Sequence, residues 1–127
     1  NLPEGRVVKA LNTDLIFDFP SRWWGGLAAG LVEKEGSVVY GKVFEIAAKD
    51  WPVVQHKEGF ITGMCIEKNI KVEHDGVIIE ATAFTTSPER SRLEGSISPR
   101  FMEALIRGAE QAKLPEDYIS KLKKISI

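Results

Sequence analysis

The pattern of hydrophobic and polar positions divides the chain into a β-rich part and a helical part. The first two thirds hold short β-rich runs separated by turn-forming residues, among them RVVKAL, DLIFDF, WWGGLAAGLV and SVVYGKVFEI. We expect hairpin turns at Asn12-Thr13 and at the charged EKEG link of residues 33–36. The strongest hairpin signal is Asp75-Gly76, which stands between GFITGMCIEKNIKVEH and GVIIEATAFTT.

Helical signals are concentrated in the last quarter of the chain. Ser98-Pro99 offers an N-cap and a first-turn proline, and the apolar residues that follow recur at helical spacing. Pro115 begins a second amphipathic segment. Earlier in the chain, residues 47–57 predict one short helix. The polar residues 87–98 predict a surface loop that is long enough to act as a lid.

Strands first and helices after predict an α+β fold. We expect a strongly bent mixed or antiparallel sheet that forms a small barrel-like core with helices outside, as one domain over residues 1–127. Glycines inside the predicted strands support the bend, namely Gly25, Gly26, Gly30 and Gly41. Such glycines occur where a sheet coils sharply or where a ligand approaches the backbone, and the sequence leaves both readings open.

Composition and charge narrow the range of partners. The chain has 127 residues, of which 43% are hydrophobic, and 17 Lys and Arg balance 18 Asp and Glu. A net charge of −1 exerts no attraction toward nucleic acid or a membrane surface, so we expect neither as a partner. The longest apolar runs have strand length, and no signal peptide is visible. A single cysteine, Cys65, excludes an internal disulfide and fits a reducing, cytoplasmic location.

Most familiar catalytic motifs are absent from the sequence. It has no G-x-S-x-G elbow, no Walker-type phosphate loop and no dinucleotide-binding glycine motif. His56 and His74 are not at metal-ligand spacing, so we expect no metal and treat them as surface or loop residues. Cys65 is typical of a small core residue rather than a nucleophile. Trp23-Trp24 could form an aromatic wall for a ligand or anchor the core with one indole partly exposed.

One carboxylate has an unusual sequence context. In QHKEGFITG, residues 55–63, Glu58 stands directly before Gly59 at the start of an apolar run. Taken alone, Glu58 is typical of a strand-end acid in solvent, and a catalytic role is the other reading.

The order of motifs along the chain favours the catalytic reading of Glu58. From about Arg6 to Ile125 the chain resembles the gamma-glutamylcyclotransferase and AIG2-like family. The resemblance rests on F-x-F at residues 17–19, WWGGLA at 23–28, VYGKVF at 39–44, Glu58-Gly59, Gly63-Met64, SPRF at 98–101, Gly108-Ala109, Leu114-Pro115, Tyr118 and Leu122.

The resemblance implies a cyclotransferase that needs no metal and no cofactor. Such enzymes release 5-oxoproline from gamma-glutamyl amines or peptides, chemistry that belongs to glutathione metabolism. Glu58 matches the family's acid/base glutamate, and partial burial beside Trp51, Phe60 and Ile61 would raise its pKa toward neutrality. By the same resemblance, the substrate-binding residues are Trp24, Gly25, Gly26, Gly59, Cys65 and Phe101. A homodimer is compatible with this family.

The chain departs from the family pattern in two ways. The family's N-terminal strand and glutamyl-binding loop, approximately Y-G-S-N, are absent from the sequence, and we expect them to precede Asn1. Cys65 and Phe101 stand where characterised members place tyrosines near the pocket, which changes what the pocket can hydrogen-bond. The alternative function is therefore a non-catalytic ligand-binding or accessory domain of the same fold.

Overall fold

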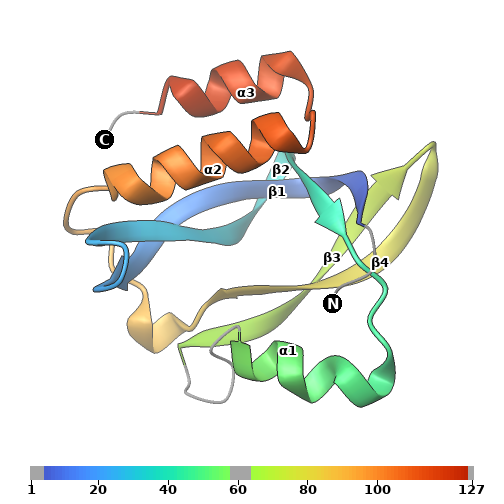
Figure 1. Cartoon of the computed structure of the whole chain (residues 1–127), viewed down its shortest axis with the longest axis horizontal. Coiled ribbons are helices and arrows are strands. Elements are labelled where there is room, and N and C mark those ends of the chain that lie inside the picture. Colours follow the sequence, from blue (N-terminus) through green and yellow to red (C-terminus); the bar gives the residue numbers. More distant parts are fainter. Residues whose placement is uncertain (1–4, 58–63, 126–127) are drawn as a thin grey trace.

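The described residues form four strands and three α-helices (Figure 1). This computed structural model describes residues 5–57 and 64–125. The strands are β1 (Arg6–Ser21), β2 (Gly26–Val43), β3 (Cys65–His74) and β4 (Val77–Thr86). The helices are α1 (Trp51–Lys57), α2 (Pro99–Gln111) and α3 (Glu116–Lys123). The predicted α+β class and the three predicted helices are confirmed.

The sheet is antiparallel, and its strand order is β2-β1-β3-β4. β1 and β2 are long, and both continue through the segments where the sequence predicts turns. The register shifts there, because Leu11 pairs with Val38 whereas Thr13 pairs with Glu33. Two bulges therefore face each other at this point, and the hairpin bends between them.

The hairpins predicted at Asn12-Thr13 and at residues 33–36 are therefore wrong. Asn12 and Gly36 have positive φ angles of 52° and 82°, the backbone geometry that a tight turn requires. The Gly36 N–H donates to Asn12 Oδ1 at 3.0 Å, which ties the two bulges together. Turn-forming residues here bend one long hairpin instead of ending two short ones.

The turn that joins β1 to β2 lies at residues 22–25, next to the tryptophan pair. Gly25 has a φ of 77°, and its N–H donates to the Ser21 carbonyl at 2.9 Å. The hairpin predicted at Asp75-Gly76 is confirmed, since these two residues alone separate β3 from β4. Their φ angles of 50° and 79° identify a type I′ turn.

Helices cover the sheet on two sides, as Figure 1 shows. α2 and α3 lie together over β1 and β2, and their contact forms the main core. Its buried members are Ala109, Leu114, Tyr118 and Leu122, with Val7, Leu15, Val39 and Tyr40 packed against them. α1 lies on the other side near β3 and β4, where Trp51 stacks on Phe84 with ring centroids 5.7 Å apart.

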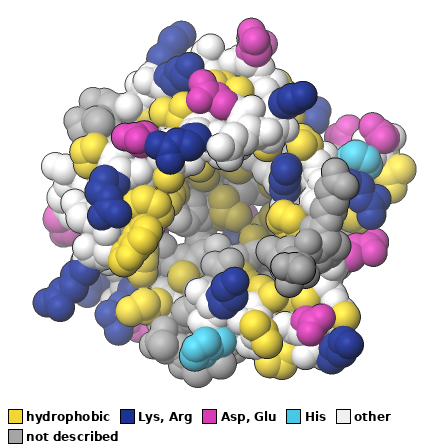
Figure 2. Space-filling model, in the orientation of Figure 1, with side chains coloured by type: hydrophobic (Ala, Val, Ile, Leu, Met, Phe, Trp, Pro, Cys, Tyr) yellow, Lys and Arg dark blue, Asp and Glu magenta, His cyan; other side chains and the backbone are white. Residues whose placement is uncertain are grey.

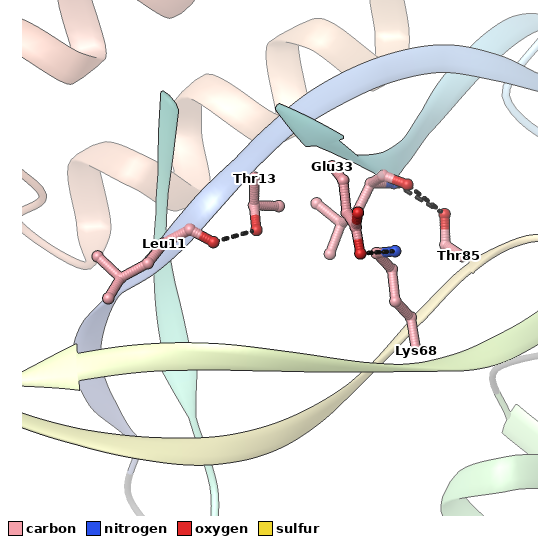
Figure 3. Close-up of polar contacts among 6 residues, drawn as sticks. Leu11, Thr13, Glu33, Lys68 and Thr85 are labelled. Atoms are coloured by element: carbon pink, nitrogen blue, oxygen red, sulfur yellow. Dashed lines mark hydrogen bonds and ion pairs between the residues drawn. The ribbon is translucent and has the colours of Figure 1, made fainter. Parts of the chain in front are cut away.

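The two edge strands of the described sheet, β2 and β4, approach each other without forming a backbone ladder. Side chains bridge the gap, as Figure 3 shows. Thr85 Oγ1 accepts from the Leu31 N–H at 2.8 Å and donates to the Leu31 carbonyl at 3.1 Å. Lys68 of β3, the neighbour of β4, places its Nζ 3.9 Å from a carboxylate oxygen of Glu33 of β2. The core is thus barrel-like but remains open along this seam in the described residues.

Candidate functional site

A cavity of about 790 Å³ lies between the sheet and α1. Figure 2 shows the molecule hollowed at its centre, with hydrophobic side chains visible inside. All four strands contribute to its lining, and α1 contributes Trp51, Val54 and Lys57. The strand residues that line it include Val8, Ala10, Leu31, Val39, Gly41, Val43, Ile70, Val72, Ile79, Ala81, Ala83 and Phe84. A cavity of this size can hold a small-molecule ligand.

The lining is mainly apolar, with a few polar side chains. Val8, Ala10 and Val72 are buried and form a small hydrophobic cluster of their own. Lys42, Glu45, Lys57, Glu80 and Thr82 supply the polar and charged groups. An apolar chamber with few polar groups favours a ligand that is held by shape and anchored at a small number of atoms.

Glu58 and Gly59 lie outside the described residues. The last described residue before them is Lys57, which ends α1 and also lines the cavity. α1 therefore carries the chain to the cavity directly before the candidate acid. The predicted roles of Glu58 and Gly59 stay predictions.

Four other candidate residues gather where the β1–β2 turn meets the start of α2. The Trp24 and Phe101 rings make an edge-to-face contact with centroids 5.3 Å apart. A Cβ on Gly26 would lie 2.9 Å from the Ser96 carbonyl oxygen and 3.0 Å from the Ser98 backbone, so only glycine fits there. Gly25 is required by its positive φ rather than by crowding.

This cluster is distinct from the described lining of the cavity, which includes neither Trp24 nor Phe101. Ser98 joins the β1–β2 turn to the start of α2. Its hydroxyl donates to the Trp24 carbonyl at 2.6 Å and accepts from the Phe101 N–H at 3.0 Å, which confirms the predicted N-cap of α2. Trp24 is half-buried whereas Trp23 is 68% exposed, an arrangement that matches a core anchor with one exposed indole. Substrate binding by Trp24, Gly25, Gly26 and Phe101 remains a prediction.

Cys65 is the first residue of β3 and lies opposite Thr86 of β4. It is half-buried, and by strand alternation it shares a face with Glu67. Glu67 accepts a hydrogen bond of 2.5 Å from Gln55, which joins α1 to this part of β3. Cys65 is not among the described residues that line the cavity.

The sequence patterns do not reveal a buried polar cluster centred on Asp18. A second register shift in β1, between Phe17 and Phe19, makes Asp18 a bulge residue. Its carboxylate accepts from the Thr86 hydroxyl at 2.8 Å and from the Ser91 hydroxyl at 2.7 Å. The F-x-F motif was the one available signal, because an acid between two phenylalanines of a strand is unusual.

The same cluster explains Gly30, for which the sequence allowed a coil or a nearby ligand. A Cβ at this position would lie 2.7 Å from Thr85 Oγ1, 2.9 Å from Thr86 Oγ1 and 3.2 Å from Asp18 Oδ1. Close approach of the protein's own side chains therefore requires glycine. Gly41, by contrast, has open space around it and lines the cavity.

Residues 87–98 form a loop that is attached to the β1–β2 hairpin at several points. The Arg92 N–H donates to the Asp18 carbonyl at 2.8 Å, and the Leu27 N–H donates to the Ser96 carbonyl at 2.9 Å. The loop also begins with a backbone bond, from the Ser87 N–H to the Met64 carbonyl at 3.0 Å. These attachments favour a fixed surface loop rather than the lid that its length suggested.

The ionisable groups of the described chain give no metal site. No three His, Cys, Asp or Glu side chains of residues 5–57 and 64–125 lie close enough together to hold an ion. His74 Nδ1 lies 3.0 Å from the Val7 carbonyl oxygen, and its Nε2 lies 3.2 Å from Asp75. None of the described helices has the length and apolar character needed to cross a membrane.

Comparison with known proteins identifies the family of this chain. A model of the AIG2-like family matches residues 38–122. The chain belongs to the AIG2-like family. The mouse (Mus musculus) gamma-glutamylcyclotransferase is 28% identical over 105 residues, which cover 82% of this chain and 54% of that enzyme. The chain thus spans about half the length of this relative.

Solved structures share the fold of this AIG2-like chain. A gamma-glutamyl cyclotransferase structure superposes with a TM-score of 0.83 at 24% identity, covering 94% of this chain and 72% of the other. An uncharacterized protein from Homo sapiens gives the same TM-score and coverage at 25% identity. YkqA from Bacillus subtilis superposes with a TM-score of 0.78 at 18% identity over 93% of this chain and 42% of that protein. The predicted family and its fold are confirmed.

Proposed function

We propose that the protein is a cofactor-independent cyclotransferase that acts on gamma-glutamyl amines or short gamma-glutamyl peptides. The products are 5-oxoproline and the free amine or amino acid. Membership of the AIG2-like family and similarity to the mouse gamma-glutamylcyclotransferase support this class of reaction.

The observation that carries the proposal is the position of the end of α1. Lys57 lines the cavity, and Glu58 is the next residue in the chain. A carboxylate at the wall of an apolar chamber is stabilised less by water than one in solvent, which favours its protonated form and raises its pKa. Such an acid can exchange a proton near neutral pH.

The proposed reaction needs one proton carrier and no protein nucleophile. The substrate's alpha-ammonium group gives a proton to Glu58, and the freed amine attacks the gamma-carbonyl carbon of the same molecule. A C–N bond forms to close the five-membered ring, and the C–N bond to the leaving amine breaks. Glu58 returns this proton to the leaving nitrogen, and the second proton that the ring nitrogen loses after attack converts the released amine into its ammonium form, so atoms and charges balance.

Binding in the cavity would favour a reaction within one molecule. Ring closure requires the amine to approach the carbonyl, and a confined chamber favours folded conformers of the substrate over extended ones. Val8, Ala10 and Val72 provide a closely packed part of the wall for this purpose.

Release of 5-oxoproline from a panel of gamma-glutamyl dipeptides and amines tests the proposal on the full-length gene product. We expect turnover by the wild type, and a decrease of roughly 10² to 10⁴ in Glu58→Gln with little change in substrate affinity. The matched control is Glu116→Gln, the same change at an exposed position in the first turn of α3. The control should retain the wild-type turnover.

Unchanged turnover in Glu58→Gln would refute the assigned mechanism. If the folded wild type binds gamma-glutamyl compounds but releases no 5-oxoproline from any of them, the protein is a ligand-binding domain of the same fold. Equal losses in Glu58→Gln and Glu116→Gln would show that the assay reports general destabilisation.

A further inference from the structure

Four of the six arginines lie at one end of the molecule, around the β1–β2 turn and the loop before α2. Together with two exposed apolar residues they form a surface that we call the arginine face, which consists of Arg22, Trp23, Arg90, Arg92, Leu93 and Arg100. No lysine occurs in residues 20–26 or 87–101. Figure 2 shows Lys and Arg side chains along the left edge of the view, where Figure 1 places the β1–β2 turn and the start of α2.

The two segments that carry the arginine face are held together as one surface. Arg100 Nη1 donates to the Trp23 carbonyl at 2.7 Å, which joins the start of α2 to the turn. Phe19 and Pro20 share a hollow of about 230 Å³ with Arg90 and Arg92. The Asp18 carboxylate accepts from the Ser91 hydroxyl, and the Asp18 carbonyl accepts from the Arg92 N–H. These bonds attach the loop to β1, so the surface has a fixed geometry before any partner binds.

Aromatic contacts fix the direction of Arg100. Its guanidinium carbon lies 5.1 Å from the centre of the Trp23 ring and 5.7 Å from that of Trp24. The two indoles meet edge to face with centroids 4.5 Å apart. Cation–π contacts of this kind hold a guanidinium in place while its other N–H groups stay available to an acceptor.

The four arginines have no carboxylate partner within the described chain. The remaining two arginines do: Arg6 pairs with Glu45 at 3.3 Å, and Arg107 pairs with Glu103 at 2.6 Å. Only two acids, Glu89 and Glu94, lie in the same segments. The arginine face is therefore positively charged on a molecule whose net charge is −1.

The arginine face also exposes large apolar side chains. Trp23 and Leu93 are each 68% exposed. Trp and Arg are the residues most often found where protein interfaces gain their binding energy, and Lys is depleted from such interfaces. This surface has that composition: it combines Trp, Leu and arginines that have no carboxylate partner among the described residues, and it contains no Lys.

We propose that the arginine face binds an acidic segment of a partner protein that also carries an apolar side chain. Carboxylates of the segment pair with the guanidiniums, and its apolar side chain covers Trp23 and Leu93. A protein segment fits better than nucleic acid or a membrane surface, because two glutamates lie among the arginines and the molecule as a whole is slightly acidic.

Selection from a phage-displayed library of random peptides tests the proposal with a defined probe. We expect the enriched peptides to contain Asp or Glu beside an aromatic or aliphatic residue. A synthetic peptide of the enriched sequence is then titrated by fluorescence anisotropy. Its affinity should fall by at least ~10-fold in Arg22→Glu/Arg92→Glu and in Trp23→Ala, and it should weaken with added salt.

The double variant Arg6→Glu/Arg107→Glu is the matched control, because it makes the same change in net charge away from the arginine face. Its affinity for the peptide should stay within about twofold of wild type. Leu93→Ser replaces Trp23→Ala if thermal melting shows that the tryptophan variant does not fold.

Three results would overturn the proposal. The first is the absence of any enriched peptide. The second is an equal loss of affinity in the control double variant, which would indicate a response to net charge alone. The third is competition by oligothymidine or by phosphatidylserine vesicles whose own binding depends on the same arginines, which would assign the surface to nucleic acid or to a membrane.

Discussion

Tyr118 shows how packing changes the chemistry of a single group. It lies in α3, its side chain is buried, and its ring contacts Tyr40 of β2 with centroids 5.1 Å apart. Burial raises the pKa of the Tyr118 hydroxyl above its usual value of 10.0, and the nearby negative charge of Asp14 acts in the same direction. A backbone hydrogen bond with Tyr40 lowers the pKa and offsets part of this shift.

The raised pKa of Tyr118 predicts a loss of stability at alkaline pH. Above pH 10 the unfolded chain releases the tyrosine proton while the folded chain retains it, so the free energy of unfolding falls as pH rises. Tyr118→Phe should remove this contribution. We expect the stability difference between wild type and Tyr118→Phe, measured by urea denaturation, to shrink between pH 8 and pH 11, and a constant difference would contradict the assignment.

The sequence identifies reactive side chains better than it identifies their neighbours. Glu58 is prominent because of its glycine neighbour and the family pattern, whereas Asp18 has no pattern of its own. The Asp18 contacts to Thr86 and Ser91 join residues 68 and 73 positions apart, and they depend on a one-residue bulge. Such contacts follow from strand register, which sequence patterns specify only when one face is consistently buried.

At the scale of the elements, alanine substitutions at two glycines should change the free energy of unfolding in opposite directions. Gly76 occupies a left-handed position in the β3–β4 turn with φ 79°, whereas Gly108 lies on the exposed side of α2 with open space around it. Gly76→Ala should destabilise the protein by about 1–2 kcal/mol, because a side chain strains this conformation. Gly108→Ala should stabilise it by about 0.5–1 kcal/mol through helix propensity.

Each glycine variant controls for the other, since both add one methyl group. Urea denaturation at fixed pH gives both differences on one scale. Two shifts of the same sign would mean that backbone conformation does not determine these effects.

The elements also show why the turns of the first hairpin were mispredicted. Asn12 and Gly36 carry the turn chemistry expected from sequence, and their φ angles confirm it. A bulge uses the same left-handed geometry as a turn, so local sequence does not distinguish the two. The actual turn contains Arg22, Trp23 and Trp24, which have no turn preference, before Gly25, and its position follows from the pairing of Ser21 with Gly26.

At the scale of the whole molecule, the seam between β2 and β4 depends on side chains. Thr85→Val keeps the shape of the side chain but removes both hydrogen bonds to Leu31. We expect a loss of about 1–3 kcal/mol in the free energy of unfolding, because the Leu31 backbone groups lose their partner. Hydrogen exchange should show faster exchange at the Leu31 amide than in wild type.

Thr82→Val is the matched control on the same strand. Thr82 is exposed, and its hydroxyl makes only a 3.5 Å contact with Asn69. Its effect should stay below about 0.5 kcal/mol. If Thr85→Val and Thr82→Val unfold at the same urea concentration, the Thr85 bonds do not hold the seam.

The facing bulges at Asn12 and residues 34–37 mark a point where the protein should tolerate insertions and deletions. One residue of β1 lies opposite four residues of β2 between the pairs Leu11–Val38 and Thr13–Glu33. Residues 34–36 are exposed, and the pairing on either side is set independently. Codons inserted or deleted here would leave both the wall of the cavity and the arginine face in register, so this is the point in the hairpin where evolution can vary the chain most freely.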